Sequence, residues 1–185
     1  MILVVVAILC VASVPLAGGR LSALSDLDLR AVWAAIGAAV IQVLIVTVLP
    51  GGSHGLHVAL HVGSYALVVL FLVANRHLVG IPLIALGAAL NIIVIAANGG
   101  VMPAASAALR IAGIEQSEDF ANSAALAHPR LLPLGDVIPI PGPWPIGNVL
   151  SVGDLLIFAG ALILLHVTCR SRLATPAMRR IGNFS

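Results

Sequence analysis

The sequence contains no lysine and few charged or aromatic side chains. All nine basic residues are arginines, charged residues make up 9% of the chain and aromatic residues 4%. Globular domains carry about 25% charged residues, so this composition argues against an ordinary soluble domain. The formal net charge of +2 is too small for a nucleic-acid-binding surface, which needs clustered basic residues. With 61% hydrophobic residues and a mean hydropathy of +1.15, the composition predicts a membrane protein.

Recognisable chemical motifs are equally scarce. The two cysteines, Cys10 and Cys169, lie at opposite ends of the chain without C-x-x-C spacing, so we expect packing residues rather than a disulfide or a redox pair. The sequence shows no Walker, Rossmann or nucleophile-elbow motif. We therefore predict no cofactor and favour a protein without enzymatic activity.

Five mainly apolar runs are each close to the length of about 20 residues that a membrane helix needs. They cover residues 1–17, 31–50, 55–74, 78–97 and 149–169. They predict an all-α fold: a polytopic membrane helix bundle of five spans that forms a single domain over residues 1–185. The first run lacks the basic residues that open a secretory signal, so we expect it to be retained.

The connection over residues 98–148 is long and rich in proline after Leu132. Within it, Pro103 suits the first turn of a helix and Gly113 its end, which predicts a short interfacial helix over residues 104–112. Short cytoplasmic loops carry the excess of positive charge. This rule predicts a bacterial inner-membrane protein with its N-terminus outside, an extracytoplasmic loop over residues 98–148 and a cytoplasmic tail over residues 170–185. Seven arginines then lie inside and two outside: Arg20, Arg30, Arg76, Arg170, Arg172, Arg179 and Arg180 against Arg110 and Arg130.

Five large polar residues lie in the predicted outer halves of these runs, namely Gln42, His57, His61, Asn91 and Asp154. At a rise of about 1.5 Å per residue, all of them lie within roughly 12 Å of the predicted outer ends of their helices. Polar side chains inside a span usually face the bundle interior. Their common depth predicts a polar pocket that opens outward beneath the long loop.

Each of these residues also has a structural interpretation. Ser151 and Asp154 have the spacing of a capping box at the start of a helix, and Gln42 and Asn91 suit hydrogen bonds between helices. His57 and His61 share a helix face with a spacing that can hold zinc. A zinc site needs a third protein ligand, however, and we predict no metal site.

A Gly-Asp pair occurs twice, at Gly135-Asp136 in the loop and at Gly153-Asp154 in the last run. Two aspartates could form an acid pair in which one carboxyl keeps the other protonated, as in intramembrane aspartyl proteases. The surrounding residues match those enzymes poorly. An intramembrane hydrolase that uses Asp136 and Asp154 is therefore an alternative function.

Four short segments together resemble a known family. They are Gly18-Gly19-Arg20-Leu21, the six residues from Asn98 to Pro103, the six from Leu134 to Pro139, and Ser151-Val152-Gly153-Asp154. In their order and spacing they resemble the bacterial membrane-protein family called domain of unknown function 5317. The resemblance implies a multi-pass bacterial membrane protein and no catalytic role. It marks as structural motif residues Gly99, Gly100, Met102, Pro103, Gly135, Ser151 and Gly153.

These observations predict a protein that binds or passes a small polar or amphipathic ligand. The predicted contacts are Gln42, His57, His61, Asn91, Asn98, Asp136 and Asp154. A structural or assembly subunit of a membrane complex is the other alternative. The predicted partners are the lipid bilayer, a small or lipid-like ligand, and a second copy or another subunit, but no nucleic acid.

Overall fold

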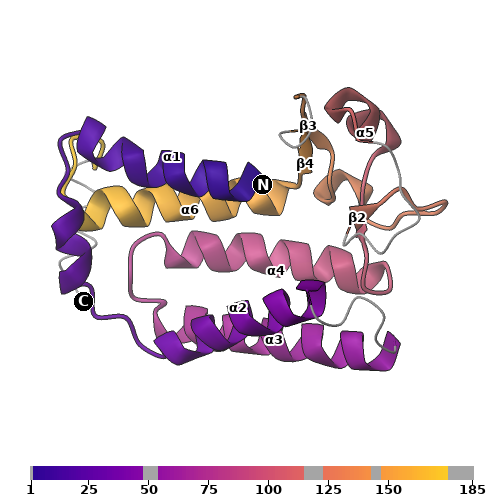
Figure 1. Cartoon of the computed structure of the whole chain (residues 1–185), viewed down its shortest axis with the longest axis horizontal. Helices are drawn as coiled ribbons and strands as arrows, with labels where there is room; N and C mark the ends of the chain where they lie inside the picture. The colour runs from indigo at the N-terminus through magenta and orange to yellow at the C-terminus, as the bar shows by residue number, and fades with distance from the viewer. Residues whose placement is uncertain (1, 48–53, 115–122, 143–146, 175–185) are drawn as a thin grey trace.

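The structure of the chain is a computed structural model that describes residues 2–47, 54–114, 123–142 and 147–174. Five long helices lie roughly along one direction, with short strands and a small helix at one end (Figure 1). The long helices are α1 (Ile2–Leu16), α2 (Val32–Thr47), α3 (His54–Ala74), α4 (Ile81–Ala97) and α6 (Val152–Thr168). The short elements are the 3-10 helices η1 (Leu21–Asp26) and η2 (Leu132–Leu134), the helix α5 (Ser106–Ala112), and the strands β1 (Met102–Pro103), β2 (Ser123–Ala124), β3 (Ile138–Ile140) and β4 (Asn148–Leu150).

Each of the five apolar runs contains one long helix, but several of the helices are shorter than the runs. Gly80, with a φ of 97°, delays the start of α4. Strand β4 occupies residues 148–150, so α6 begins only after its cap at Ser151. As a result α4 and α6 contain 17 residues each, and the described parts of α1 and α2 contain 15 and 16.

The predicted membrane topology is wrong. Within the described ranges, none of the helices combines the length and the apolar character that crossing a bilayer requires. Helices of 17 residues extend only about 26 Å, whereas the hydrocarbon layer is about 30 Å thick. Helix α3 has 21 residues, but its first half contains three histidines and Ser64. The multi-pass bundle, its inner-membrane location and the orientation derived from the arginines are therefore not supported.

The prediction of an all-α fold is also wrong, because the long connection forms two pairs of strands. Strands β1 and β2 pair in parallel, and β3 and β4 pair antiparallel with Ile138 opposite Leu150. Because proline-rich segments cannot form a regular helix, pairing between strands satisfies their buried backbone N–H and C=O groups. Pro139 fits at the centre of β3 because short edge strands tolerate proline.

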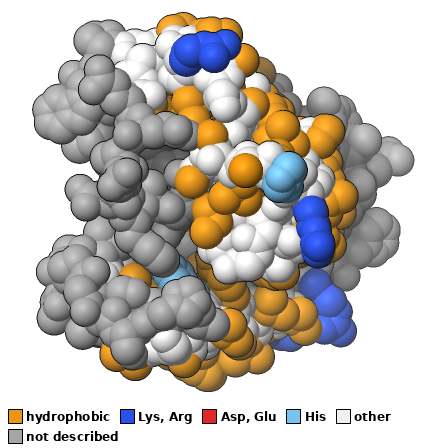
Figure 2. All heavy atoms as spheres, turned by 90° about the vertical axis from the view of Figure 1, so that its right-hand side faces the viewer, with side chains coloured by type: hydrophobic (Ala, Val, Ile, Leu, Met, Phe, Trp, Pro, Cys, Tyr) orange, Lys and Arg blue, Asp and Glu red, His pale blue; other side chains and the backbone are white. Residues whose placement is uncertain are grey.

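The predicted short helix is present as α5, but it begins at Ser106 instead of residue 104. Ala104 is held in an isolated parallel bridge with Asp136, and the left-handed Gly113 ends the helix. Ala104, Ala108, Leu109, Ala112 and Val149 form a small hydrophobic core under this end of the molecule. Figure 2 shows the same end from outside, where hydrophobic side chains form much of the described surface between isolated arginine and histidine side chains.

Helices α4 and α6 pack closely through two glycine pairs. A Cβ on Gly87 would collide with the carbonyl oxygen of Gly153, and a Cβ on Gly160 would lie 2.7 Å from the carbonyl oxygen of Gly80. Each helix repeats its glycine after seven residues, which is two helical turns and places both on one face. Small residues of this kind let two backbones approach each other closely.

We predict that Gly87→Ala destabilises the protein, whereas Gly63→Ala does not. The added methyl group on residue 87 would force α4 away from Gly153 and the backbone of Ile157, at a cost of about 1–3 kcal/mol. A Cβ on Gly63 meets no atom within 4 Å, and alanine is better than glycine in a helix by about 0.5–1 kcal/mol. Thermal and urea unfolding of both variants measures the difference. Equal stability of the two variants would contradict the close packing of α4 on α6.

Candidate functional site

Asn91, Ser151 and Asp154 form a closed hydrogen-bond network between α4 and α6. Asn91 Nδ2 donates to Asp154 Oδ1 over 2.9 Å, and Ser151 Oγ donates to Asn91 Oδ1 over 2.9 Å. The backbone N of Ser151 donates to Asp154 Oδ2, and the backbone N of Asp154 donates to Ser151 Oγ. The capping box expected from the spacing of Ser151 and Asp154 is therefore present, and it also binds the neighbouring helix.

A second polar cluster joins α2 and α3. Gln42 Nε2 donates to Ser64 Oγ over 2.7 Å and lies 3.4 Å from His61 Nδ1. The fully buried Ser64 donates in turn to the carbonyl oxygen of His61. The ring of His61 lies 6.0 Å from that of Tyr65, and burial raises the pKa of the Tyr65 hydroxyl. Gln42 thus has the role of a hydrogen-bond partner between helices.

Four of the seven predicted ligand contacts consequently fall into two separate clusters, each with its own partners. Asn91 and Asp154 meet in one, and Gln42 and His61 meet in the other. Within the described residues, every buried side-chain nitrogen or oxygen has a hydrogen-bond partner, and no three histidine, cysteine or acidic side chains come together as a metal site. The side chain of His57 lies outside the described residues. The described contacts do not assemble one shared chamber from these residues.

The loop residues Asn98 and Asp136 hold the chain in place. Asn98 Nδ2 donates to the carbonyl oxygens of Val94 and Arg130, and its Oδ1 accepts from the backbone N of Arg130, each over 2.8 Å. Asp136 is buried, and its backbone N donates to the carbonyl oxygen of Pro103 over 2.9 Å. The two residues join distant parts of the connection to the end of α4 and to β1.

The glycines of the family motif have clear backbone roles. Gly99 and Gly100 have φ values of 70° and 99°, which side-chain-bearing residues rarely adopt, and they turn the chain after α4 into the buried strand Met102–Pro103. Gly135 lies against the carbonyl oxygen of Pro103 without space for a Cβ. The segment from Asn98 to Pro103 is therefore a helix end followed by a strand.

The hydrolase alternative needs the carboxyl groups of Asp136 and Asp154 to share a proton. The described hydrogen bonds of the Asp154 carboxylate go to Asn91 and to the backbone of Ser151. The backbone of Asp136 pairs with Ala104, and the residue is buried. An acid pair of Asp136 and Asp154 stays a prediction.

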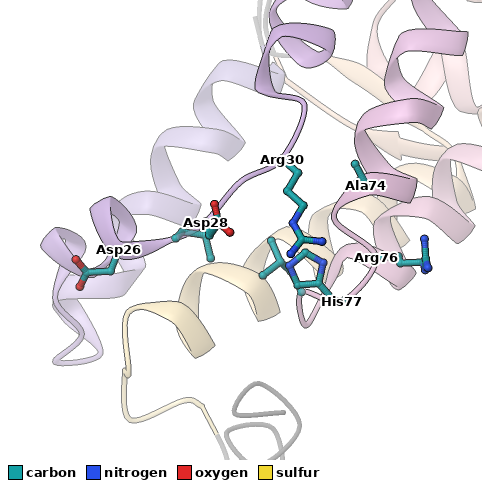
Figure 3. A pocket seen from close by; sticks show the side chains of 8 residues that line it. Asp26, Asp28, Arg30, Ala74, Arg76 and His77 are labelled. Carbon is teal, nitrogen blue, oxygen red and sulfur yellow. The ribbon is translucent and has the colours of Figure 1, made fainter. Parts of the chain in front are cut away.

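A pocket of about 510 Å³ lies at the opposite end of the molecule from α5. Two segments line it: the end of η1 with the following linker, and the turn between α3 and α4 (Figure 3). We call it the arginine pocket, and its lining residues are Asp26, Leu27, Asp28, Arg30, Ala74, Arg76, His77 and Leu78. Its volume is within the range of about 300–1,000 Å³ that is usual for small-molecule sites.

Asn75 builds this pocket. Its fully buried side chain accepts a hydrogen bond from the backbone N of Arg30 and donates to the carbonyl oxygens of Arg30 and Phe71, each over 2.8 Å. These bonds fasten the linker to the end of α3. Ala31 then turns the chain into α2 with a φ of 53°. The backbone that carries Arg30 is therefore fixed although its side chain is exposed.

The charged side chains of the arginine pocket do not neutralise one another. Over the described ranges, no ion pair involves the carboxylates of Asp26 and Asp28 or the guanidinium groups of Arg30 and Arg76. Arg76 Nη1 makes one long hydrogen bond of 3.3 Å to the carbonyl oxygen of Val73. The pocket thus presents unpaired charges of both signs to solvent.

The sequence did not lead us to predict this pocket, because the arginines of its two segments were used only to predict the orientation of the helices in a membrane. The available signal was that both polar breaks, residues 25–30 and 75–77, contain arginine and flank α2 and α3. These two helices pack against each other, with the start of α2 beside the end of α3.

A third buried cluster joins α1 to α6. His166 Nε2 lies 3.0 Å from Ser13 Oγ, and His166 Nδ1 lies 2.7 Å from Ser171 Oγ. Ser13 already donates its hydroxyl proton to the carbonyl oxygen of Cys10, so the Nε2 proton of His166 must donate to Ser13. The ring of His166 thus connects Ser13 on α1 to Ser171, which follows α6. Nearby, burial raises the pKa of the Cys169 thiol.

Comparison with known proteins gives a family without an assigned activity. A model described as "Family of unknown function (DUF5317)" matches residues 26–166, which confirms the predicted resemblance. An uncharacterized protein of Thermotoga maritima is 36% identical over 100 residues, which are 54% of this chain and 58% of the relative. The chain thus spans less than two thirds of that relative's length. No solved structure matches the chain.

We predict that Asn91 and Asp154 are energetically coupled. Asp154→Ala removes one of the two bonds of the capping box, worth up to about 1 kcal/mol, and leaves the amide of Asn91 without its acceptor, which costs a further 1–3 kcal/mol or so. Asn91→Ala removes the same bond. The loss in unfolding free energy of the double variant should therefore be smaller, by about 1–3 kcal/mol, than the sum of the losses of the two single variants. A double-mutant cycle of urea unfolding measures this. Additive losses would show that the two side chains act independently.

We also predict that Cys169 resists alkylation in the folded protein. Its raised pKa leaves less thiolate near pH 8, and only the thiolate attacks a maleimide. The rate of alkylation of Cys169 should therefore rise as the pH is increased to the ordinary pKa of a thiol and beyond it. Mass spectrometry after N-ethylmaleimide treatment at pH 8 should show Cys169 labelled at least about tenfold more slowly than the partly exposed Cys10. Unfolding in urea should equalise the two rates, and equal rates before unfolding would contradict the buried position.

Proposed function

Because this chain belongs to the family of unknown function DUF5317, we propose its function from its own geometry: it binds a small amphipathic molecule whose polar end occupies the arginine pocket. The observation that supports this is the combination of an open pocket with unpaired charges and exposed apolar side chains beside it. The polar group of such a molecule would pair with the charges. Its hydrocarbon part would cover the adjacent apolar surface.

The apolar surface begins within one helical turn of the pocket. Along α2, Trp33, Ile36, Val40 and Val43 are between 51% and 65% exposed. Their spacing of three and four residues places them on one face of the helix. On α3, Val69 and Val73 are about half exposed and lead up to the pocket residue Ala74. Contiguous exposed apolar surface of this kind marks an interaction site.

This proposal keeps the predicted class of ligand and changes its place. The predicted contacts Gln42, Asn91 and Asp154 already make hydrogen bonds to one another and to neighbouring groups. A ligand there would have to replace hydrogen bonds that already exist. In the arginine pocket the charged groups face solvent, so a ligand gains their interactions without breaking internal ones.

Helix α1 favours a second candidate, an assembly subunit. Ile8 and Leu9 are 61% and 62% exposed, and Leu16 is 87% exposed. Helix α1 lies on the other side of α6 from the α2–α3 pair (Figure 1), so a ligand that extends from the arginine pocket along α2 and α3 would not cover this face. A second copy or another protein subunit with an apolar face would do so.

The exposed Trp33 offers a direct test of ligand binding. In a Trp144→Phe background, Trp33 is the single tryptophan, and the full-length chain can be kept in alkyl maltoside solution. We expect a chain-brominated phospholipid to quench Trp33 at a concentration at least about tenfold lower than a brominated alkyl maltoside with the same chain, because only the former has a charged head. Arg30→Gln should abolish this preference, and Arg110→Gln, on α5, should leave it unchanged. Equal quenching by both amphiphiles would refute the proposed function.

A further inference from the structure

The arginine pocket separates its charges into an acidic half and a basic half. Asp26 and Asp28 lie on the η1 side, and the side chain of Arg30 extends from the linker toward His77 (Figure 3). Arg76 points away from them in the same view. The pocket therefore has one end that attracts cations and one that attracts anions.

From this separation we infer that the polar end of the ligand is a zwitterion, with an ammonium group beside Asp26 and Asp28 and a phosphate beside Arg30 and His77. This inference rests on the proposed function and names the chemistry of its ligand. Phosphoethanolamine is the simplest molecule of this class, either free or as the head group of a phospholipid. Both sources join an ammonium group to a phosphate, which carries a charge of about −1.5 to −2 as the monoester of the free molecule and a single negative charge as the diester of a phospholipid.

The two halves of the pocket disfavour ligands with one charge only. A simple anion attracted by Arg30 would lie near two carboxylates, and a simple amine attracted by these carboxylates would lie near a guanidinium group. Juxtaposed like charges reduce the affinity for the wrong partner. A zwitterion turns both halves into attractive contacts, so it should bind more tightly than either of its parts.

Arg30 and His77 favour phosphate as the anionic group. The guanidinium group is a planar fork that matches two oxygens of a phosphate. The imidazole of His77 offers a further donor at the same end of the pocket, and a phosphate has an additional oxygen to accept it. Asn75 fixes the backbone of Arg30 through two hydrogen bonds, which reduces the ordering needed when the anion binds.

Calorimetric titration of the full-length chain tests this inference with three separate probes: O-phosphoethanolamine, inorganic phosphate and ethanolamine. We expect O-phosphoethanolamine to bind at least about tenfold more tightly than either of the others, because it alone satisfies both halves. Arg30→Gln should weaken its binding by about tenfold or more. Asp28→Asn should weaken it too, but should strengthen the binding of inorganic phosphate by removing a repulsive charge.

Arg110→Gln is the matched control, because Arg110 is an exposed arginine on α5 outside the pocket, and it should leave all three affinities unchanged. The exposed positions 28 and 30 allow these substitutions without loss of the fold, which unfolding midpoints verify. Inorganic phosphate binding as tightly as O-phosphoethanolamine would overturn the inference. An unchanged affinity of Asp28→Asn for O-phosphoethanolamine would do the same.

A second comparison separates this inference from the proposed function. Dihexanoyl-phosphatidylethanolamine should bind more tightly than dihexanoyl-phosphatidylglycerol, whose head carries only the negative charge. If both phospholipids bind equally well, the amphipathic ligand stands and the zwitterion falls. If O-phosphoethanolamine binds and the phospholipids bind no more tightly, the zwitterion stands as a free small molecule and the amphipathic ligand falls.

Discussion

Buried polar groups must be paired, and three of the pairings in this molecule also join two helices. Gln42 on α2 bonds to Ser64 on α3, Asn91 on α4 bonds to Asp154 on α6, and His166 on α6 lies between Ser13 on α1 and Ser171. An unpaired amide or imidazole in the interior costs about 1–3 kcal/mol. Each of these side chains therefore fixes which helices are neighbours and how far one is shifted along the other, which nondirectional apolar contacts specify less sharply.

The same constraint shapes the interpretation of the site. Polar residues within the apolar helices were expected to mark a ligand site. In the structure, the hydrogen bonds described for these residues go to other groups of the protein instead. What is left for a ligand is a surface where charges are fixed in position but unpaired, next to apolar side chains. The family match carries no activity to transfer, so this contrast between saturated interior groups and unsaturated surface groups is the basis of the functional proposal.

The sequence could predict the helices better than their lengths or their environment. Composition located all five long helices, and the spacing of Ser151 and Asp154 indicated the capping box. Gly80 and the strand at residues 148–150 shorten α4 and α6 relative to the predicted membrane spans. The arginine pocket could not be foreseen, because the bond from Asn75 to Arg30 joins residues 45 positions apart. Periodicity along one helix contains no information about such a pair.

The glycine pairs of α4 and α6 have a mechanical consequence. They bring the backbones of α4 and α6 together over two full turns, so that these two helices form one rigid pair. Helix α3 packs much less extensively against α4. The turn that connects the α2–α3 pair to the α4–α6 pair carries Ala74, Arg76 and His77. Any rotation of α2 and α3 relative to α4 and α6 would widen or narrow the arginine pocket. A ligand bound in this pocket would restrict that rotation.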